Sequence, residues 1–226
     1  MPVLAAGSIE RTSLRDQALT AIRQALVTGR IVPGQVYSAA SLAAELGVSN
    51  SPVREAMLAL VDDGLMEAVP NRGYRPVALT GADLAEITQL RMLLEVPAAG
   101  LAAESGLDGR LGELTQLVVK IEQSAVAGDL AGNLDADRRF HLLLVEACGN
   151  KRLTEMVARL RDQTRLYNLP ALAASGALVA SAAEHRPLLD AVAAGDRQRA
   201  ETLMREHLAH ITADWSAGPS SRIPQL

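Results

Sequence analysis

Four side chains in the second half of the chain have the types and spacing of a metal site. Asp137 and His141 are four residues apart, so on a helix a carboxylate and an imidazole would share one face. His185 and His207 follow in later segments. Three imidazoles and one carboxylate suit zinc first, and also nickel, manganese or a similar divalent ion. Taken singly, each histidine is more often a hydrogen-bonded core residue or a surface group, and the D-x-x-x-H spacing alone is weakly specific.

The segments that would position these residues are predicted to be helical. From Thr80 onward, Ala/Leu-rich stretches have helical periodicity and no convincing strand appears. Glycine and proline positions divide this region into predicted helices at 81–105, 110–127, 130–148, 151–168, 176–194 and 197–215. Six helices with short connections predict an all-α antiparallel bundle. Pro97 and Pro187 fall within predicted helices, where we expect a kink or a restart.

A second pattern runs from Leu42 to Arg75, LAAELGVSNSPVREAMLALVDDGLMEAVPNRGYR. It predicts a short helix, a turn at Gly47-Val48 and a second helix with Ser49 or Asn50 at its N-cap. The expected buried positions recur at helical spacing: Leu42, Ala43 and Leu46 in the first helix, then Val53, Ala56, Met57 and Leu60 in the second. Gly64 would end the second helix. Together with the two short strands that follow Gly64, this order of elements predicts a winged helix-turn-helix, which is a DNA-binding fold.

The wing is predicted from two short strands, 66–69 and 74–77, joined by the turn at 70–73. Arg72 would lie at its tip, next to Gly73. At the start of the second helix, Ser49, Asn50, Ser51 and Arg54 would point outward. Hydroxyls and main-chain N–H groups there suit phosphates, and an arginine fork suits base edges. Alternatively, Arg54 forms a surface salt bridge and Arg72 is a solvated loop charge.

Length and composition are consistent with two domains. The chain has 226 residues, 49% of them hydrophobic, which excludes wholesale disorder. We expect a DNA-binding domain at 1–79, an all-helical domain at 80–215 and a flexible tail at 216–226. No run approaches 18 apolar residues and the N-terminus does not resemble a signal peptide, so we expect a cytoplasmic protein without membrane partners. The single cysteine, Cys148, is interpreted as a buried small hydrophobe.

The charge distribution limits the electrostatic part of DNA binding. Residues 1–79 carry 7 Lys+Arg and 7 Asp+Glu, and the remainder carries 15 and 19. The DNA-binding region therefore has no net charge. Phosphate neutralisation should contribute modestly, and specific contacts together with dimerisation should supply most of the affinity.

The helix-turn-helix stretch is similar to the DNA-binding domain of the GntR superfamily of bacterial transcription regulators. The upstream segment agrees, since Ala18–Gly29 is amphipathic and 29–34, GRIVPG, matches the family's G-x-I-x-P-G connection. Many relatives carry arginine where this chain has Asn50. An asparagine at this position suits contact with an adenine base. The later motifs resemble the FadR subfamily with its FCD ligand-binding domain: RMLLE at 91–95, DRRFH at 137–141, ACGN at 147–150, EH at 184–185 and REHL at 205–208.

This resemblance implies a regulator rather than an enzyme, with Asp137, His141, His185 and His207 holding a metal. It also implies a small organic acid as effector. Arg91 is our candidate anchor for its carboxylate, since a guanidinium fork matches that group, with an intrahelical pair to Glu95 as the alternative. We expect a homodimeric repressor on a palindromic operator, released by the acid. Two other hypotheses are a regulator with a purely structural metal and a metal-dependent hydrolase, for which no evident general base is present.

Overall fold

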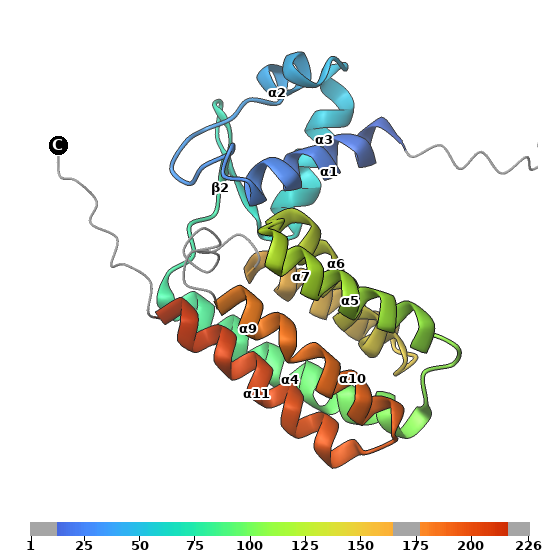
Figure 1. Cartoon of the computed structure of the whole chain (residues 1–226). Helices are drawn as coiled ribbons and strands as arrows, with labels where there is room; N and C mark the ends of the chain where they lie inside the picture. Colours follow the sequence, from blue (N-terminus) through green and yellow to red (C-terminus); the bar gives the residue numbers. More distant parts are fainter. Residues whose placement is uncertain (1–12, 165–176, 217–226) are drawn as a thin grey trace, which may run out of the picture. The chain divides into compact units, whose positions relative to one another are not determined.

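The computed structural model describes residues 13–164 and 177–216, except for the side chains of 211–216. The chain forms two compact units, Met1–Val77 and Ala78–Leu226 (Figure 1). The positions 165–168 of one predicted helix, Gly176, and the predicted tail after Ser216 lie outside the described residues. In the part of the chain that is described, no helix is both long enough and apolar enough to cross a membrane.

The first unit is a winged helix-turn-helix, as predicted. Its elements are α1 (Leu14–Val27), α2 (Ala39–Leu46), α3 (Asn50–Asp62), β1 (Met66–Val69) and β2 (Gly73–Pro76). Ser38 caps α2 by accepting from the backbone N–H of Ser41, and Gly47 ends it in the left-handed conformation at φ 66°. The apolar face of α3 is fully buried and packs on α1. These contacts hold the start of α3 in a fixed orientation within this unit.

One apolar position of α2 departs from the prediction. Leu42 and Ala43 are buried, whereas Leu46 is 38% exposed. Leu46 lies in the last turn of α2, where it lines a small hollow of about 200 Å³ together with Leu14 and Val48. The helix is therefore anchored by its first turns and leaves its last one partly open.

The wing is an antiparallel pair in which Met66 lies opposite Pro76 and Val69 opposite Gly73. Tyr37 adds two backbone hydrogen bonds to Tyr74, at 2.7 and 2.9 Å, and so ties the wing to the segment before α2. Gly73 has φ +132°, and a Cβ there would collide with the carbonyl of Tyr37. Close packing therefore accounts for glycine at this position.

The second unit is all-helical in its described part, as predicted. Its helices are α4 (Gly81–Ser105), α5 (Leu111–Ala127), α6 (Leu130–Glu146), α7 (Lys151–Thr164), α9 (Ala177–Ala183), α10 (His185–Ala193) and α11 (Arg197–Ser216). Aliphatic and alanine side chains fill most of its core, around the fully buried Phe140. A capping box between Thr80 and Asp83 begins α4. Pro97 is accommodated inside α4.

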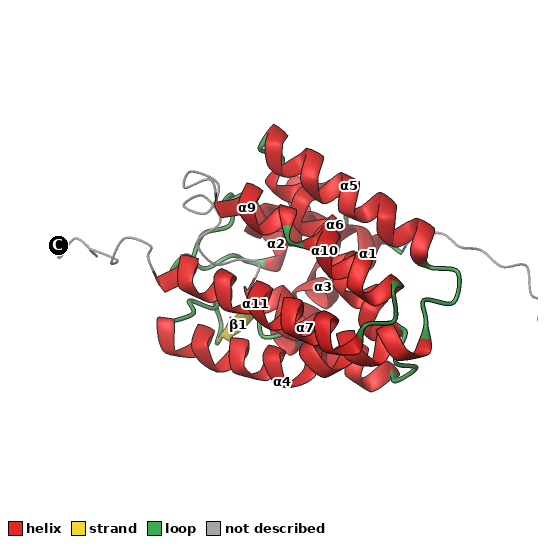
Figure 2. Ribbon diagram, turned by 60° about the horizontal axis from the view of Figure 1, so that its bottom comes forward, coloured by secondary structure: helices red, strands yellow, loops and turns green. Residues whose placement is uncertain are grey.

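The helices α4 and α11 lie side by side along much of their length (Figure 2). Gly100 of α4 faces Glu201 and Arg197 of α11, and a Cβ at this position would collide with the Glu201 side chain. Buried alanines at 99 and 103 flank this contact. Small residues thus allow α11, which carries His207, to approach the centre of the bundle closely.

The stretch predicted as one helix at 176–194 is two helices. It is divided at Glu184, which separates α9 from α10. Pro187 lies in the first turn of α10. Backbone N–H groups in a first turn have no intrahelical acceptor, so proline costs no helical hydrogen bond there. The restart that proline permits is therefore present, and it falls next to His185.

Candidate metal centre and DNA-reading surface

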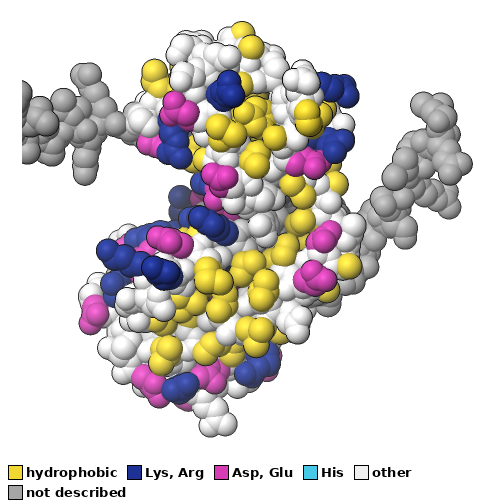
Figure 3. All heavy atoms as spheres, turned by 180° about the vertical axis from the view of Figure 1, so that it is seen from behind, with side chains coloured by type: hydrophobic (Ala, Val, Ile, Leu, Met, Phe, Trp, Pro, Cys, Tyr) yellow, Lys and Arg dark blue, Asp and Glu magenta, His cyan; other side chains and the backbone are white. Residues whose placement is uncertain are grey.

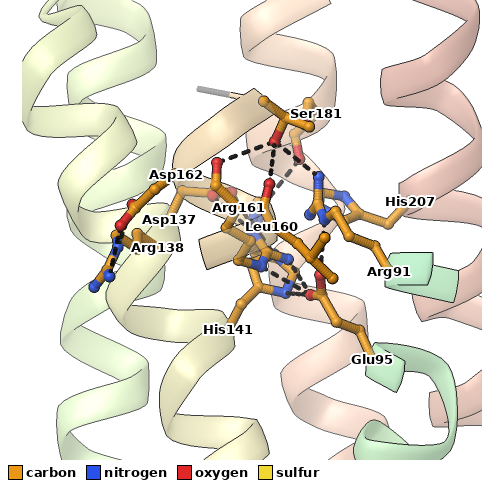
Figure 4. A network of polar contacts seen from close by, with 12 residues as sticks. Arg91, Glu95, Asp137, Arg138, His141, Leu160, Arg161, Asp162, Ser181 and His207 are labelled. Atoms are coloured by element: carbon orange, nitrogen blue, oxygen red, sulfur yellow. Dashed lines mark hydrogen bonds and ion pairs between the residues drawn. The ribbon is translucent and has the colours of Figure 1, made fainter. Parts of the chain in front are cut away.

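Four residues predicted as metal ligands come together in the helical unit. Each offers one ligand atom, and these atoms all lie within 4.8 Å of one another. Asp137 and His141 come from α6, His185 from the first position of α10, and His207 from α11. The three histidines are at most 2% exposed, and Asp137 is partly buried. Figure 4 shows Asp137 and His141 of α6 pointing toward His207 of α11.

Hydrogen bonds on the far side of two rings set their orientation. The Nδ1 of His185 lies 3.1 Å from the carbonyl oxygen of Ser181, and the Nδ1 of His207 lies 2.8 Å from Oε2 of Glu184. Because these oxygens only accept, each Nδ1 carries the proton and each Nε2 offers a lone pair when the ring is neutral. Such outer hydrogen bonds are typical of metal-binding histidines.

Two of the inner nitrogen atoms of the cluster lack hydrogen-bond partners among the described residues. Within the described residues, Nε2 of His141 and Nε2 of His207 are buried without a hydrogen bond. Nε2 of His185 faces Oδ1 of Asp137 at 3.1 Å, an arrangement that requires a proton or a cation between the two atoms. Leaving buried polar atoms unpaired is costly. A divalent cation would satisfy all three nitrogens and the carboxylate, so the residues present fit such an ion.

The protonation states also suit a metal. Burial lowers the pKa of His141 well below its usual value, and Arg161 lowers it further. Burial likewise lowers the pKa of His207 to about 4, although its hydrogen bond to Glu184 opposes the shift. Burial alone would raise the pKa of Asp137, but His141, His185 and Arg161 together hold it well below its usual value. Two neutral imidazoles and an ionised carboxylate are the forms that bind a metal.

A buried network of charges surrounds the cluster. Arg161 of α7, only 3% exposed, donates from Nη1 to Oδ2 of Asp137 at 3.0 Å and from Nε to Oε2 of Glu95 at 2.8 Å. Its Nη2 also contacts Glu95. Burial would raise the pKa of Glu95, but Arg161 and Arg91 outweigh it and keep this carboxyl ionised. Arg161 thus joins Asp137 to α4 (Figure 4).

Arg91, the predicted effector anchor, is also part of this network. Its Nε donates to Oε1 of Glu95 at 2.7 Å, so the intrahelical pair considered as the alternative is present. Its Nη1 reaches Oγ1 of Thr164 at 3.5 Å, while its Nη2 is buried without a partner in the described chain. The pair with Glu95 therefore leaves one donor of the guanidinium available.

Sequence reasoning missed Arg161 and the contact of Glu184 with His207. It also missed that Glu95 pairs with Arg161 in addition to Arg91. A clue existed for Arg161, because Val157, Arg161 and Thr164 recur at helical spacing on the buried face of α7. An arginine on such a face requires an acidic partner. Glu184 was part of the EH motif at 184–185, but no pattern indicated its contact with His207, since its position depends on the break between α9 and α10.

In the winged unit, the predicted DNA-contacting residues at the start of α3 are exposed: Ser49, Asn50, Ser51 and Arg54. Ser49 occupies the N-cap position, but its side chain makes no capping hydrogen bond. The Ser51 hydroxyl donates to Glu55 at 3.2 Å. The first turn of α3 therefore exposes backbone N–H groups and short polar side chains, which is an arrangement suited to phosphate contact.

The two arginines considered for DNA contact are not held by acids. Neither Arg54 nor Arg72 forms an ion pair with any residue of the described ranges, so the surface salt bridge considered for Arg54 is absent there. In contrast, Arg75 on the wing pairs with Glu67 at 2.7 Å. Asn71 adopts φ 60° in the turn that exposes Arg72.

A winged helix-turn-helix with exposed polar residues at the start of its second helix defines a DNA-binding protein of the winged-helix class. Residues 14–75 match the bacterial regulatory proteins of the gntR family, and residues 86–210 match the FCD domain. The chain therefore belongs to the GntR family of transcription regulators and carries an FCD domain.

Relatives of known name and structure agree with this membership. The chain is 32% identical to an uncharacterized HTH-type transcriptional regulator of Streptomyces ambofaciens, over 90% of this chain and 85% of that protein. It is 32% identical to a probable D-xylose utilization operon transcriptional repressor of Paenarthrobacter nicotinovorans, over 89% and 88%. It is similar in structure to E. coli McbR/YncC, with a TM-score of 0.77 and 27% identity, over 88% and 95%.

The class of activity follows from the family. Its members are transcription regulators, so the hydrolase considered from the sequence is not supported. FCD domains can bind metal, and the histidine–aspartate cluster lies within residues 86–210.

Proposed function

We propose that this regulator is a homodimeric repressor whose operator affinity falls when a small carboxylic acid binds at a divalent-metal site in the helical unit. The observation that carries this proposal is the cluster of Asp137, His141, His185 and His207, in which two buried Nε2 atoms have no hydrogen-bond partner in the described part of the chain. These four residues would hold zinc, or alternatively nickel or manganese. When bound, the ion would offer an open coordination position to a carboxylate oxygen.

Charge around the site favours an anionic effector. Without the ion, the buried charges of Glu95 and Asp137 balance those of Arg91 and Arg161. With neutral imidazoles, a divalent cation would leave this region with two excess positive charges. Because uncompensated charge is costly in a buried site, one or two carboxylates are the complement that electrostatics favours.

Arg91 is the proposed second anchor for the acid. Its buried Nη2 is a charged donor without a partner in the described residues, and a carboxylate would satisfy it. The Thr88 hydroxyl, one turn earlier on the same helix, is also buried without a partner there. These two groups give α4 a polar stretch able to distinguish acids by the oxygens they carry.

The proposed DNA contacts lie on the winged unit. Backbone N–H groups and the hydroxyls of Ser49 and Ser51 would contact phosphates, while Asn50 and Arg54 would read bases in the major groove. Arg72, presented by the close-packed Gly73, would contact the backbone or the minor groove from the wing. Asn50 favours adenine at the base it would contact.

The proposed dimer contact lies on the helical unit, where α4 exposes Leu90, Leu93 and Leu101 and the neighbouring α7 exposes Met156. Figure 3 shows hydrophobic side chains gathered over one face of this unit. A second copy of the chain is the occupant that fits, since GntR regulators usually act as dimers. Two copies would place two winged units on the half-sites of a palindromic operator. Leu93→Glu should then yield a monomer in light scattering, and an unchanged mass would contradict this contact.

The switch would need only a moderate coupling between acid and DNA. A free-energy coupling of about 1–3 kcal/mol changes affinity by roughly 5–150-fold. A thermal-shift screen of zinc-loaded protein against small carboxylic acids, repeated after chelation, tests the proposal. We expect stabilisation by at least one acid, loss of that stabilisation in metal-free protein, and release of bound DNA by the same acid. An acid that stabilises the metal-free protein equally would contradict a role for the ion.

A constitutive regulator with a structural metal is the second candidate. The buried pair between Arg91 and Glu95 favours it, because that pair holds the Arg91 side chain without any ligand. Under this alternative, zinc would raise thermal stability, whereas no acid would add to it. Arg91→Ala distinguishes the two candidates, because only the effector hypothesis predicts that this substitution weakens acid binding.

A further inference from the structure

The junction between α9 and α10 contains a carboxylate whose two oxygens are both engaged by histidines. Oε2 of Glu184 lies 2.8 Å from Nδ1 of His207, and Oε1 lies 2.5 Å from Nδ1 of His210. His207 is buried, whereas the His210 side chain is 63% exposed. Glu184 thus lies between a proposed metal ligand and a surface histidine on the next turn of α11.

The same junction orients a second proposed ligand. At the end of α9, the carbonyl oxygen of Ser181 accepts the backbone N–H of Glu184 at 3.2 Å, which leaves it a second lone pair. The Nδ1 of His185 lies 3.1 Å from the carbonyl oxygen of Ser181 and 3.2 Å from that of Ala182. One helix break therefore provides an accepting group behind His185 and another behind His207.

We propose that Glu184 is a positioning residue of the metal centre, which fixes His207 as its Nδ1–H tautomer and directs Nε2 toward the ion. An ionised carboxylate accepts hydrogen bonds and donates none, so the hydrogen bond to His207 requires the proton on Nδ1. In the other tautomer, Nε2 would carry the proton and could not bind a cation. The inference rests on the metal site proposed above and assigns it a residue outside the four ligands.

His210 has a supporting part in this arrangement. Its contact with Oε1 leaves Oε2 turned toward His207, but it lies on the exposed side of the carboxylate. Its removal should therefore affect metal binding less than removal of Glu184. Glu206 is a suitable control because it is an exposed acid directly before His207 in the sequence.

The test measures zinc affinity of the full-length protein by competition with a chromophoric chelator. Glu184→Ala should weaken zinc binding about 10–100-fold, the usual effect of losing an outer hydrogen-bond partner. Glu184→Gln should lose less, since its amide oxygen can still accept from Nδ1. The zinc affinities of His210→Ala and Glu206→Ala should remain within about threefold of the wild-type affinity. Wild-type affinity in both Glu184 variants would overturn the proposal.

Nitrogen NMR of the metal-free protein provides an independent readout. We expect His207 to show a protonated Nδ1 in wild type and to lose this preference in Glu184→Ala. If wild type binds no zinc, the metal site proposed above fails, while the tautomer of His207 still decides whether Glu184 positions the ring. If Glu184→Ala fails to fold, Glu184→Met carries both measurements, because methionine has a similar length and no oxygen to accept from Nδ1. An unchanged tautomer with unchanged affinity in that variant contradicts the inference.

Discussion

The two units present their functional groups in opposite ways. In the winged unit, Arg54 and Arg72 are exposed and form no ion pair within the described residues. In the helical unit, Arg91 and Arg161 are each 3% exposed and are held by Glu95, which is itself fully buried. Exposed arginines can meet a ligand without losing a protein partner, whereas the buried ones already belong to a network.

This difference predicts different consequences of substitution. A charge exposed to water contributes little to folding, so its removal should affect binding alone. A charge in a buried pair leaves an uncompensated partner when it is removed, so the fold loses stability as well. Residues of the helical unit should therefore couple stability to ligand binding, and residues of the winged unit should not.

The largest expected effect is that of Arg161→Ala. The substitution would leave Glu95 and Asp137 buried with fewer cationic partners, and should lower the free energy of unfolding by about 3–5 kcal/mol. Urea unfolding of the metal-free protein, followed by circular dichroism, measures the change. Arg152→Ala on the exposed side of α7 is the matched control and should cost about 0.5 kcal/mol or less. Equal losses of unfolding free energy in the two variants would show that the buried charge network stabilises the fold no more than an exposed charge does.

Removal of metal should have the next largest effect. At free zinc about 100-fold above its dissociation constant, binding stabilises the folded state by about 2.7 kcal/mol. Chelation of zinc-loaded wild type should therefore lower thermal stability, while chelation should leave His141→Ala unchanged because a ligand is missing. Inductively coupled plasma spectrometry of both proteins gives their metal content. Equal zinc in wild type and His141→Ala would show that the ion binds elsewhere.

Much of this architecture was predictable because it depends on local patterns. The spacing of Val53, Ala56, Met57 and Leu60 predicted the buried face of α3, and all four are fully buried. The Asp137-x-x-x-His141 spacing placed two groups on one helix face because four residues make about one turn. The resemblance of the later motifs to the FCD domain then predicted that His185 and His207, on other helices, join Asp137 and His141 in one site.

The rest depends on contacts that spacing does not encode. A kink or restart was expected at Pro187, but its position at Glu184 was not predicted, because the alanine-rich stretch before Glu184 continues in helical phase into α10. Arg161 was overlooked because its partners, Glu95 and Asp137, lie 66 and 24 residues away in the sequence. The pair of Arg91 with Glu95 was foreseen as one alternative, but its location in the core follows only from the packing of α4.

Arg54→Ala tests the other side of the comparison, where binding should change without folding. Loss of a bidentate base contact should cost about 1–3 kcal/mol of binding free energy on the DNA sequence that wild type selects from a random library. Thermal unfolding should be unchanged, because Arg54 has no protein partner in the described ranges. Arg15→Ala is a control that removes the same charge from a residue already held by Asp16 at 3.0 Å. An equal loss of affinity in the two variants would mean that Arg54 acts only through its charge.

The smallest expected effect belongs to Arg72, and it should appear in the salt dependence of binding. Because residues 1–79 have as many acidic as basic side chains, the logarithm of affinity should fall only shallowly with the logarithm of salt concentration. Arg72→Ala should reduce that slope by about one for each copy that contacts a phosphate, with little change in sequence preference. Arg75→Ala should change the slope less, since Glu67 already pairs with that guanidinium. A slope insensitive to Arg72 would mean that the wing is not an electrostatic contact. A steep wild-type slope would contradict the modest phosphate contribution expected from the charge balance of residues 1–79.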